Sequence, residues 1–327
     1  MEIPRRQVLQ LAAGAAAIAA TAVPPRVSAA DYPTRPVRLI VGFPPGGAAD
    51  IAARIAGQLL SERLGQQIIV ENRPGAGTNI GTEAVVRAPP DGYTLLLVSV
   101  ANTVNATLYE KLGYNFIRDI APVASISRGP LVMEVHPAVP ARSVAEFVAY
   151  ARANPGKMNM SSPGNGTPGH MAGEMFKMMT GASIVHVPYR GGGAGLTDLL
   201  SGQVQVAFDN LQTSLEHIKT GRVMALAVTA AVRSEMLPQL PTVGESVPGF
   251  EVSSWFGIGA PGNTPGVIIE RLNREINGCL ADPRLKARFA DLGAAVLAGS
   301  PAAFGKLVTE ETEKWAKVVK FAGIKAE

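Results

Sequence analysis

The chain has 327 residues, of which 47% are hydrophobic and 17% charged, and its formal net charge at pH 7 is +4. A chain of this length can bury a large core, and its size favours two domains. The small net charge argues against a nucleic-acid-binding protein, which would carry a strongly basic surface. The single cysteine, Cys279, has no partner for an internal disulfide, and its helical surroundings predict a buried packing role.

The first thirty residues have the pattern of an export signal. Arg5-Arg6 precedes a weakly hydrophobic run at 11–20, which is far shorter than the roughly 20 residues that span a bilayer. The small residues of Val27-Ser-Ala29 predict cleavage near residue 29 or 30. The arginine pair predicts the twin-arginine route, with general secretion as the alternative, and both predict a periplasmic protein. Removal of residues 1–30 lowers the formal charge from +4 to +2.

Short apolar runs then alternate with helical patterns, which predicts an α/β fold with mostly parallel strands. In the first unit a strand at 37–43 precedes a helix that ends near Gly65, since glycine is common just after a helix. Further strands are expected at 67–71, 93–100, 121–126, 131–135, 158–161, 184–188, 204–208 and 223–229, with Pro130 and Pro137 as breaks. Further helices are expected at 147–153, 170–179, 194–200 and 215–219.

The end of the chain suggests how its domains are arranged. Prolines punctuate residues 238–265, which we interpret as a connection, and residues 265–327 are helical by pattern apart from a short strand at 294–297. A helical tail of this size must pack on another part of the chain. We therefore predict that residues 31–130 and 250–327 form domain 1 and that residues 131–249 form domain 2.

Two glycine-rich turns each leave an apolar run and open a helical pattern. They are Gly42-Phe-Pro-Pro-Gly-Gly-Ala-Ala-Asp50 and Ser161-Ser-Pro-Gly-Asn-Gly-Thr-Pro-Gly-His170. Such turns direct free backbone N–H groups and the positive end of a helix at one point, which suits an anion. Neither contains Lys or Arg, so an anion would rely on backbone donors and hydroxyls. Asp50 is expected to cap its helix or to order a water that a ligand touches.

A catalytic apparatus is not evident in the sequence. The four histidines, His136, His170, His186 and His217, have no metal-ligand spacing, so no metal site is expected. No Gly-x-Ser-x-Gly motif is present. We expect no enzyme; the alternative is a secreted hydrolase that would use Ser161 or Ser162 with His170 and Asp209.

Two other glycine motifs do not have the spacing of nucleotide sites. Gly75-Ala-Gly-Thr-Asn-Ile-Gly81 departs from the dinucleotide fingerprint, and Arg190-Gly-Gly-Gly-Ala-Gly195 lacks the P-loop lysine. The second motif is either a flexible loop or a loop that faces a ligand. No cofactor is expected.

Several motifs follow one another along nearly all of the mature chain: Tyr32-Pro-Thr-Arg-Pro36, Phe43-Pro-Pro-Gly-Gly47, Glu71-Asn-Arg-Pro-Gly-Ala-Gly77, Asp91-Gly-Tyr-Thr-Leu95, Ser162-Pro-Gly-Asn-Gly-Thr-Pro168, His170-Met-Ala-Gly-Glu174, Val187-Pro-Tyr-Arg-Gly191, Leu237-Pro-Gln-Leu-Pro-Thr242 and Ala260-Pro-Gly-Asn-Thr-Pro265. In this order they resemble the solute-binding receptors of tripartite tricarboxylate transporters, the Bug family. The resemblance implies a type II periplasmic-binding-protein fold, in which a double crossover hinge joins two α/β domains and the ligand cleft lies between them.

The resemblance also implies that the two turns hold a ligand carboxylate, partly through ordered waters. The residues it implies for ligand binding are Phe43, Gly46, Gly47, Ala48 and Asp50 in the first turn, Ser162, Asn165, Thr167 and His170 in the second, and Tyr189 and Asp209 at strand ends. Ala49 stands where family members often carry a hydroxyl residue, so one donor is missing on that side.

The sequence therefore predicts a monomeric, non-catalytic periplasmic receptor that delivers a small organic acid to membrane subunits of a transporter. The alternative is a receptor that reports the bound acid to a membrane sensor. With no Arg or Lys in either turn, we expect one deeply held carboxylate rather than a tricarboxylate.

Overall fold

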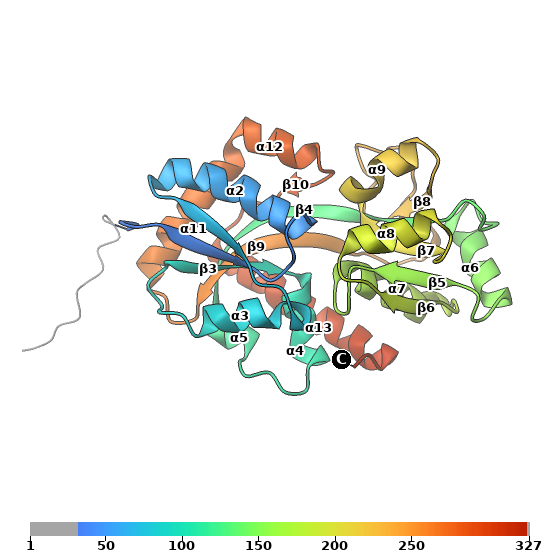
Figure 1. The fold of residues 1–327 in the computed structure, drawn as a ribbon, viewed down its shortest axis with the longest axis horizontal. Coiled ribbons are helices and arrows are strands. Elements are labelled where there is room, and N and C mark those ends of the chain that lie inside the picture. Colours follow the sequence, from blue (N-terminus) through green and yellow to red (C-terminus); the bar gives the residue numbers. More distant parts are fainter. Residues whose placement is uncertain (1–31, 326–327) are drawn as a thin grey trace, which may run out of the picture. The chain divides into compact units, whose positions relative to one another are not determined.

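The computed structural model describes residues 32–325, and the chain from Pro33 onward forms one compact unit. The predicted export signal, residues 1–30, lies outside the described residues. Of the helices in the described part, none is long and apolar enough to span a bilayer. A mixed β-sheet carries helices on both faces (Figure 1), so the predicted α/β class is confirmed.

The sheet contains two groups of parallel strands. The first group is β1 (Val37–Val41) between β2 (Ile68–Asn72) and β3 (Thr94–Ser99). The second is β5 (Asn159–Ser162) between β6 (Val185–Pro188) and β7 (Val206–Asn210). Two antiparallel strands connect the groups, β4 (Ile120–Val135) and β9 (Ser253–Pro261), while β8 (Met224–Val228) and β10 (Ala295–Val296) pair with β4.

Strand β4 corrects one prediction, because it runs unbroken for 16 residues where the sequence predicted two strands separated at Pro130. It pairs with β9 as far as Pro130 and with β7 and β8 from Leu131 onward. Proline has no N–H to donate to a ladder. Pro130 stands where the strand exchanges one set of neighbours for the other, so the strand continues through it.

Strand β9 corrects a second prediction, because the sequence analysis placed only a connection there. Pro248 precedes the strand and Pro261 ends it, so these prolines delimit an element rather than exclude one. The same stretch contains the short helix α10 (Val243–Ser246), which Thr242 caps by accepting the Glu245 N–H. The division of the chain into two domains near residues 130 and 250 stays a prediction.

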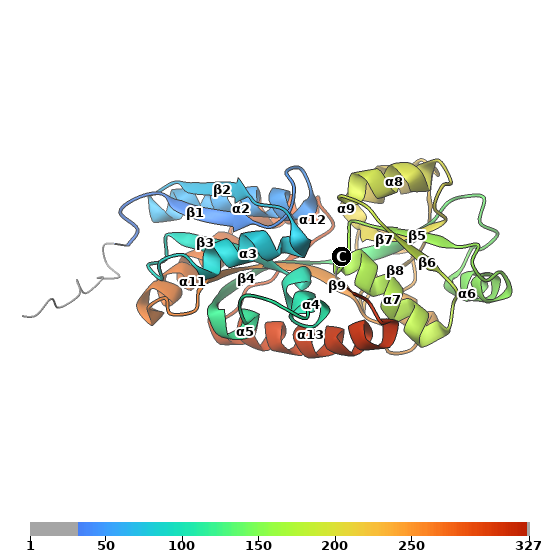
Figure 2. The ribbon, with the colours of Figure 1, turned by 60° about the horizontal axis from the view of Figure 1, so that its bottom comes forward.

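Helices cover both faces of each parallel group (Figures 1 and 2). On the first group, α2 (Ala48–Leu64) lies on one face, and α3 (Asn79–Val86) and α4 (Val100–Leu108) lie on the other. On the second, α8 (Gly192–Leu200) and α9 (Leu211–Lys219) lie opposite α7 (Pro168–Thr180). The remaining helices are the 3₁₀ turn η1 (Ala76–Thr78), α5 (Phe116–Asp119), α6 (Val144–Ala153), α11 (Gly266–Ala281), α12 (Pro283–Ala290) and α13 (Pro301–Ala322).

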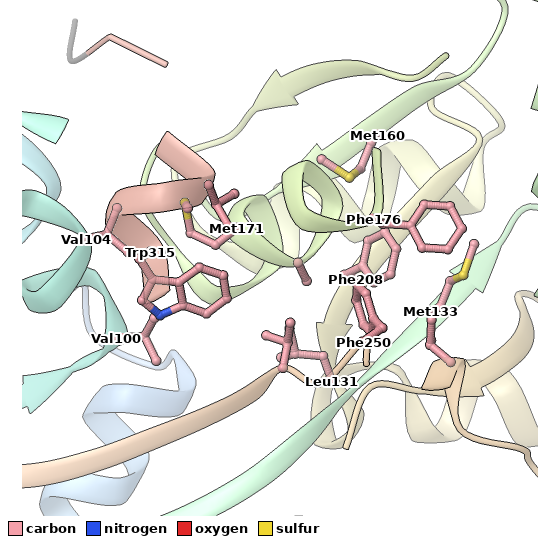
Figure 3. Close-up of a cluster of buried hydrophobic side chains, with 14 of the residues drawn as sticks. Val100, Val104, Leu131, Met133, Met160, Met171, Phe176, Phe208, Phe250 and Trp315 are labelled. Atoms are coloured by element: carbon pink, nitrogen blue, oxygen red, sulfur yellow. The ribbon is translucent and has the colours of Figure 1, made fainter. Parts of the chain in front are cut away.

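The C-terminal helix α13 contacts α4, which follows β3 of the first strand group, α7, which follows β5 of the second, and β4 itself. Its Trp315 is fully buried and lies near Val100 and Val104 of α4 and Met171 of α7 (Figure 3). The sequence predicted that the helical tail would cover domain 1. The tail also contacts α7, the helix that follows the second turn, so it packs against helices of both strand groups.

Candidate functional site

Both predicted turns lie at the carboxyl ends of parallel strands. The first joins β1 to α2, and the second joins β5 to α7. In open α/β sheets, ligands bind outside the carboxyl ends of the strands. The two groups run in opposite directions, because β9 is antiparallel to both β3 and β4 and β4 is antiparallel to β7. Each turn lies at the carboxyl edge of its own group, where such folds hold ligands.

Asp50 organises the first turn. Its side chain is 4% exposed, and Oδ2 accepts the Gly46 N–H at 2.9 Å, which ties the helix to the residue before its N-cap. Gly46 has φ +83°, a conformation that favours glycine. Oδ1 accepts a hydrogen bond from the Asn72 amide at 2.9 Å and pairs with Arg54 Nη2 at 2.9 Å. The carboxylate is thus enclosed by donors of the chain itself.

These contacts keep Asp50 ionised. Burial alone would raise the pKa of its carboxyl, but the hydrogen bonds from Arg54, Gly46 and Asn72 outweigh burial and hold the pKa below its ordinary value. Asn72 also donates to the Phe43 carbonyl at 3.1 Å, so it holds the first turn at a second point. The sequence analysis did not select Asn72 for the site, because its contacts join the ends of two strands.

The second turn is held largely by the side chains predicted to bind ligand. The Thr167 hydroxyl donates to the Gly164 carbonyl at 2.7 Å, and the Gly166 N–H donates to His170 Nδ1 at 3.0 Å. Ser162 Oγ lies 2.6 Å from Nε2 of His186. Because Thr167 uses its proton within the turn, its hydroxyl is not a free donor in this conformation.

Asn165 differs from its neighbours in the second turn. It is half-buried, and within the described part of the chain its side chain makes no hydrogen bond. Its amide N–H₂ group is therefore free for a ligand in this conformation.

Four helices that start at the carboxyl edges of the two strand groups begin without a side-chain cap. They are α2, α7, α8 and α9, which follow Gly47, Thr167, Gly191 and Asn210. By contrast, the N-cap side chains of α6, α10, α12 and α13 accept a backbone N–H: Ser143, Thr242, Asp282 and Ser300. The first-turn N–H groups of the uncapped helices are left to water or to an anion.

Tyr189 and Asp209 both lie beside the second turn. The Tyr189 N–H donates to the Ser162 carbonyl at 3.0 Å, and a Cβ on Gly192, the first residue of α8, would lie 3.4 Å from the Asp209 carboxylate. The Tyr189 hydroxyl donates to Asp198 at 2.6 Å, and burial together with this bond raises its pKa to about 12. Tyr189 therefore carries a neutral phenol whose proton is engaged by Asp198. Burial also raises the pKa of Asp209.

A cavity of about 20 Å³ connects the two sides of the site. It is lined by Ala48 from the first turn, by Asn210 and Leu211 after Asp209, and by residues of β4, β9 and 292–294. This is room for about one water molecule. Ala48 and the segment after Asp209 are thus brought together, and the predicted role of both turns in ligand binding stays a prediction.

A larger cavity of about 200 Å³ lies away from both turns. It is lined by Val98, Phe116, Ile117, Ile120, Pro122, Phe304, Gly305, Val308 and Thr309. This lining is almost wholly apolar and offers little to an anion, so the cavity is not the predicted site.

The loop after β2 supports the first turn with a strained backbone. Ala76 has φ +46° and Thr78 has φ +84°, and a β-branched residue rarely adopts the left-handed region. A Cβ on Gly42 would lie 2.6 Å from the Thr78 Cβ, so glycine is needed where the two loops meet. The spacing of this glycine motif bears only on a cofactor site, and its contact with the first turn leaves no signal in the sequence.

One group of described residues, His170, Glu174 and His186, places potential metal-ligand atoms within 4.8 Å of one another. The two rings stack, with centroids 3.8 Å apart and planes 12° apart, so their in-plane lone pairs run nearly parallel instead of converging on one point. Their nitrogens already serve Gly166 and Ser162, and Glu174 pairs with Lys177 at 2.6 Å. The group is a hydrogen-bonded network rather than a ready set of metal ligands.

The same network does not assemble the form of the hydrolase alternative that uses Ser162. The Ser162 hydroxyl pairs with His186 rather than with His170, whose Nδ1 accepts the Gly166 N–H. Burial is the main cause that lowers the pKa of His186, to about 3, and the neighbouring His170 adds to it. The proposed arrangement of Ser162, His170 and Asp209 is therefore not assembled.

Gly169 is expected to fix the second turn against β7. A Cβ at this position would lie 2.4 Å from the Phe208 carbonyl oxygen, and backbone atoms yield only at a cost. We expect Gly169→Ala to lower the free energy of unfolding by about 1–3 kcal/mol, as measured by urea titration. Gly193→Ala is the control, since a Cβ there meets nothing within 4 Å. Equal stability of the two variants would contradict the packing described here.

Comparison with known proteins gives consistent matches along the chain. Residues 52–324 match the family model described as "Tripartite tricarboxylate transporter family receptor". The chain is 37% identical to the protein BugT of Bordetella pertussis over 311 residues, which are 94% of this chain and 95% of BugT.

Two similar solved structures are described with ligands. The Rhodopseudomonas palustris protein Rpa4515 with adipate has a TM-score of 0.84 and 38% identity, covering 90% of this chain and 99% of that one. MatC of the same organism with bound malate has a TM-score of 0.81 and 30% identity, covering 88% of this chain and 100% of that one.

Proposed function

Because the chain belongs to the tripartite tricarboxylate transporter receptor family, which includes the Bug proteins, we propose that it captures a small dicarboxylate and delivers it to the membrane subunits of such a transporter. The family consists of solute-binding receptors rather than enzymes. Export by the signal at residues 1–30, a periplasmic location, a monomeric state and a lack of catalytic activity belong to the same proposal.

The observation that carries the proposal is the set of uncapped helix starts at the carboxyl edges of the two parallel strand groups. The first turns of α2, α7, α8 and α9 leave backbone donors free, and the side-chain amide of Asn165 is also free. Neither turn contains lysine or arginine. Micromolar binding needs about −8 kcal/mol, and a hydrogen bond to a charged group contributes about 1.5–3 kcal/mol. Four or five such bonds to a carboxylate provide this affinity.

The class of ligand follows from the relatives and from the charges. Rpa4515 and MatC, whose structures are described with adipate and malate, both share at least 30% identity with this chain. A site built from neutral donors holds one carboxylate well, but three buried carboxylates would lack compensating charge. We therefore expect a dicarboxylate with one carboxylate held deeply between the turns.

The proposed geometry is closure of two parts about the strands β4 and β9. Residues 31–130 with 250–327 would form one part and residues 131–249 the other. The change of strand neighbours at Pro130 and Leu131 supports a hinge at this point. Ala48 and Asn210, which line one cavity, would face the ligand from the two sides.

A single backbone donor tests the site. Ala48 is the first residue of α2, where proline is tolerated, and Gly47 before it has an extended conformation that suits a following proline. We expect Ala48→Pro to keep the melting temperature and to weaken dicarboxylate binding about tenfold, because one charge-assisted hydrogen bond is lost. Isothermal titration calorimetry with adipate and malate measures the change.

Gly266→Pro is the matched control, because it places proline at the first position of α11, away from the turns. It should bind like the wild type. If Ala48→Pro also binds like the wild type, then the α2 N-terminus does not contact the ligand.

A further inference from the structure

A buried polar network lies behind the second turn. It begins at Ser162, whose Oγ lies 2.6 Å from Nε2 of His186 on β6, and the His186 ring stacks on His170 at 3.8 Å. From His170 it continues along α7 to Glu174, with 3.6 Å between Nε2 and Oε1, and then to Lys177, with 2.6 Å between Nζ and Oε1. The network thus connects the turn to a side chain near the surface.

The buried polar side chains of this network are stabilised by their contacts with one another and with Lys177. His170 is 2% and Glu174 5% exposed, whereas the Lys177 side chain is 23% exposed. A buried carboxylate is costly unless it is paired. Lys177 supplies the full positive charge that Glu174 contacts, and the imidazole of His170 faces the same carboxylate oxygen.

The hydrogen bond from Gly166 sets the proton count of His170. Because Nδ1 accepts the Gly166 N–H, it carries a lone pair, and the single ring proton lies on Nε2 towards Glu174. A second proton on the ring would turn Nδ1 into a donor that faces another donor. The Gly166 bond would then be lost and the turn released.

We propose that Glu174 and Lys177 are positioning residues for the second turn: Lys177 neutralises Glu174, so that His170 remains singly protonated and keeps its bond to Gly166. The titratable groups in contact with His170 are Glu174 on its own helix and His186 from β6, and Lys177 acts through Glu174. This inference rests on the proposed function, because it assumes that the second turn binds the ligand.

The test removes the lysine and measures affinity at two pH values. In Lys177→Met the Glu174 carboxylate keeps only imidazoles as partners and favours a second proton on His170. We expect wild-type affinity for adipate or malate at pH 8 and a loss of about tenfold relative to the wild type at pH 6, which corresponds to one hydrogen bond. Lys177→Arg should restore the wild-type profile.

Two further variants separate this effect from a merely structural one. The double variant with Glu174→Gln and Lys177→Met should show no additional loss of ligand affinity at pH 6, because the negative charge that attracts a second proton to His170 is gone. Lys219→Met removes the lysine of an exposed pair with Glu216 and should bind like the wild type at both pH values. Equal weakening of Lys177→Met at pH 8 and pH 6, or no weakening at either, would overturn the proposal.

A second measurement needs no ligand. The ¹⁵N chemical shifts of the His170 imidazole report its protonation state, and we expect a larger doubly protonated fraction at pH 6 in Lys177→Met than in the wild type. Identical spectra would overturn the inference whether or not the protein binds a carboxylate. If the wild type binds no carboxylate, the proposed function fails, and these spectra still decide the proton count.

Discussion

Replacement of Asp50 by alanine is expected to lower the free energy of unfolding by about 2–4 kcal/mol and to weaken carboxylate binding at least tenfold. The carboxylate accepts hydrogen bonds from the Gly46 N–H and the Asn72 amide, and both donors would lose a charged acceptor. The Arg54 side chain is 53% exposed, so its pair contributes little of this stability. Urea titration and calorimetry measure the two effects.

The stability effect of Asp50→Ala should depend on pH in a defined direction. The pKa of Asp50 is lowered in the folded protein, so its contribution is present above the unfolded value of about 3.9 and is lost as pH falls through the folded pKa. The difference between wild type and variant should be constant from about pH 8 to pH 5 and shrink below about pH 4.

Asp119→Ala is the matched control for Asp50→Ala. Its carboxylate also accepts a backbone N–H, from Asn115 at 2.7 Å, and pairs with an arginine, Arg118, on α5 away from the turns. It should leave ligand affinity unchanged. A variant at Asp50 with wild-type affinity would show that the first turn does not need this carboxylate.

Glu134→Gln is expected to make the protein more stable at alkaline pH. Glu134 is fully buried on β4, where Ser214 donates to Oε1 at 2.8 Å and Oε2 has no partner among the described residues. Burial, reinforced by the nearby Asp209, raises its pKa well above the ordinary value. Glu134 therefore retains its proton in the folded protein at pH values at which the same carboxyl group is ionised in the unfolded chain.

The direction of this pH effect is opposite to that for Asp50. Above the unfolded pKa of about 4.3, the wild type should lose about 1.4 kcal/mol of stability per pH unit until the folded pKa is reached. Glutamine has no proton to lose, so the variant should match the wild type near pH 4 and exceed it by at least about 1.4 kcal/mol at pH 8. Urea titrations at both pH values measure this.

Glu310→Gln serves as the control for Glu134→Gln. The Glu310 side chain is 62% exposed on α13, so this change should leave the pH dependence as it is in the wild type. If Glu134→Gln is less stable than the wild type at pH 8, the buried carboxyl is ionised and has a partner that the structure does not show.

Local patterns predicted most of the fold. Alternating apolar runs and turn residues placed the strands of both parallel groups to within a few residues, and Gly65 ends α2, as expected, in the left-handed conformation. The predictions failed where tertiary pairing overrides local signals. Pro130 lies inside β4 because the strand changes neighbours there, and β9 lies between prolines that look like a loop in the sequence.

The candidate site was predicted less completely than the fold. The two turns were found from their glycines, because a glycine-rich helix start without a capping side chain is a pattern of adjacent residues. The contacts that hold the turns join residues far apart in the chain, as Asn72 does with Asp50 and His186 with Ser162. The partners of such a pair have no characteristic separation along the chain, so no sequence motif reveals them. The role of Thr167 within its own turn also depends on where the hydroxyl proton points.

The most direct test of the central claim is calorimetric titration of the mature wild-type protein with adipate and malate, after unfolding and refolding to remove copurified ligand. We predict binding of one molecule per chain, with a dissociation constant on the order of micromolar or tighter. Absence of binding to these acids and to a wider panel of mono-, di- and tricarboxylates would contradict the account.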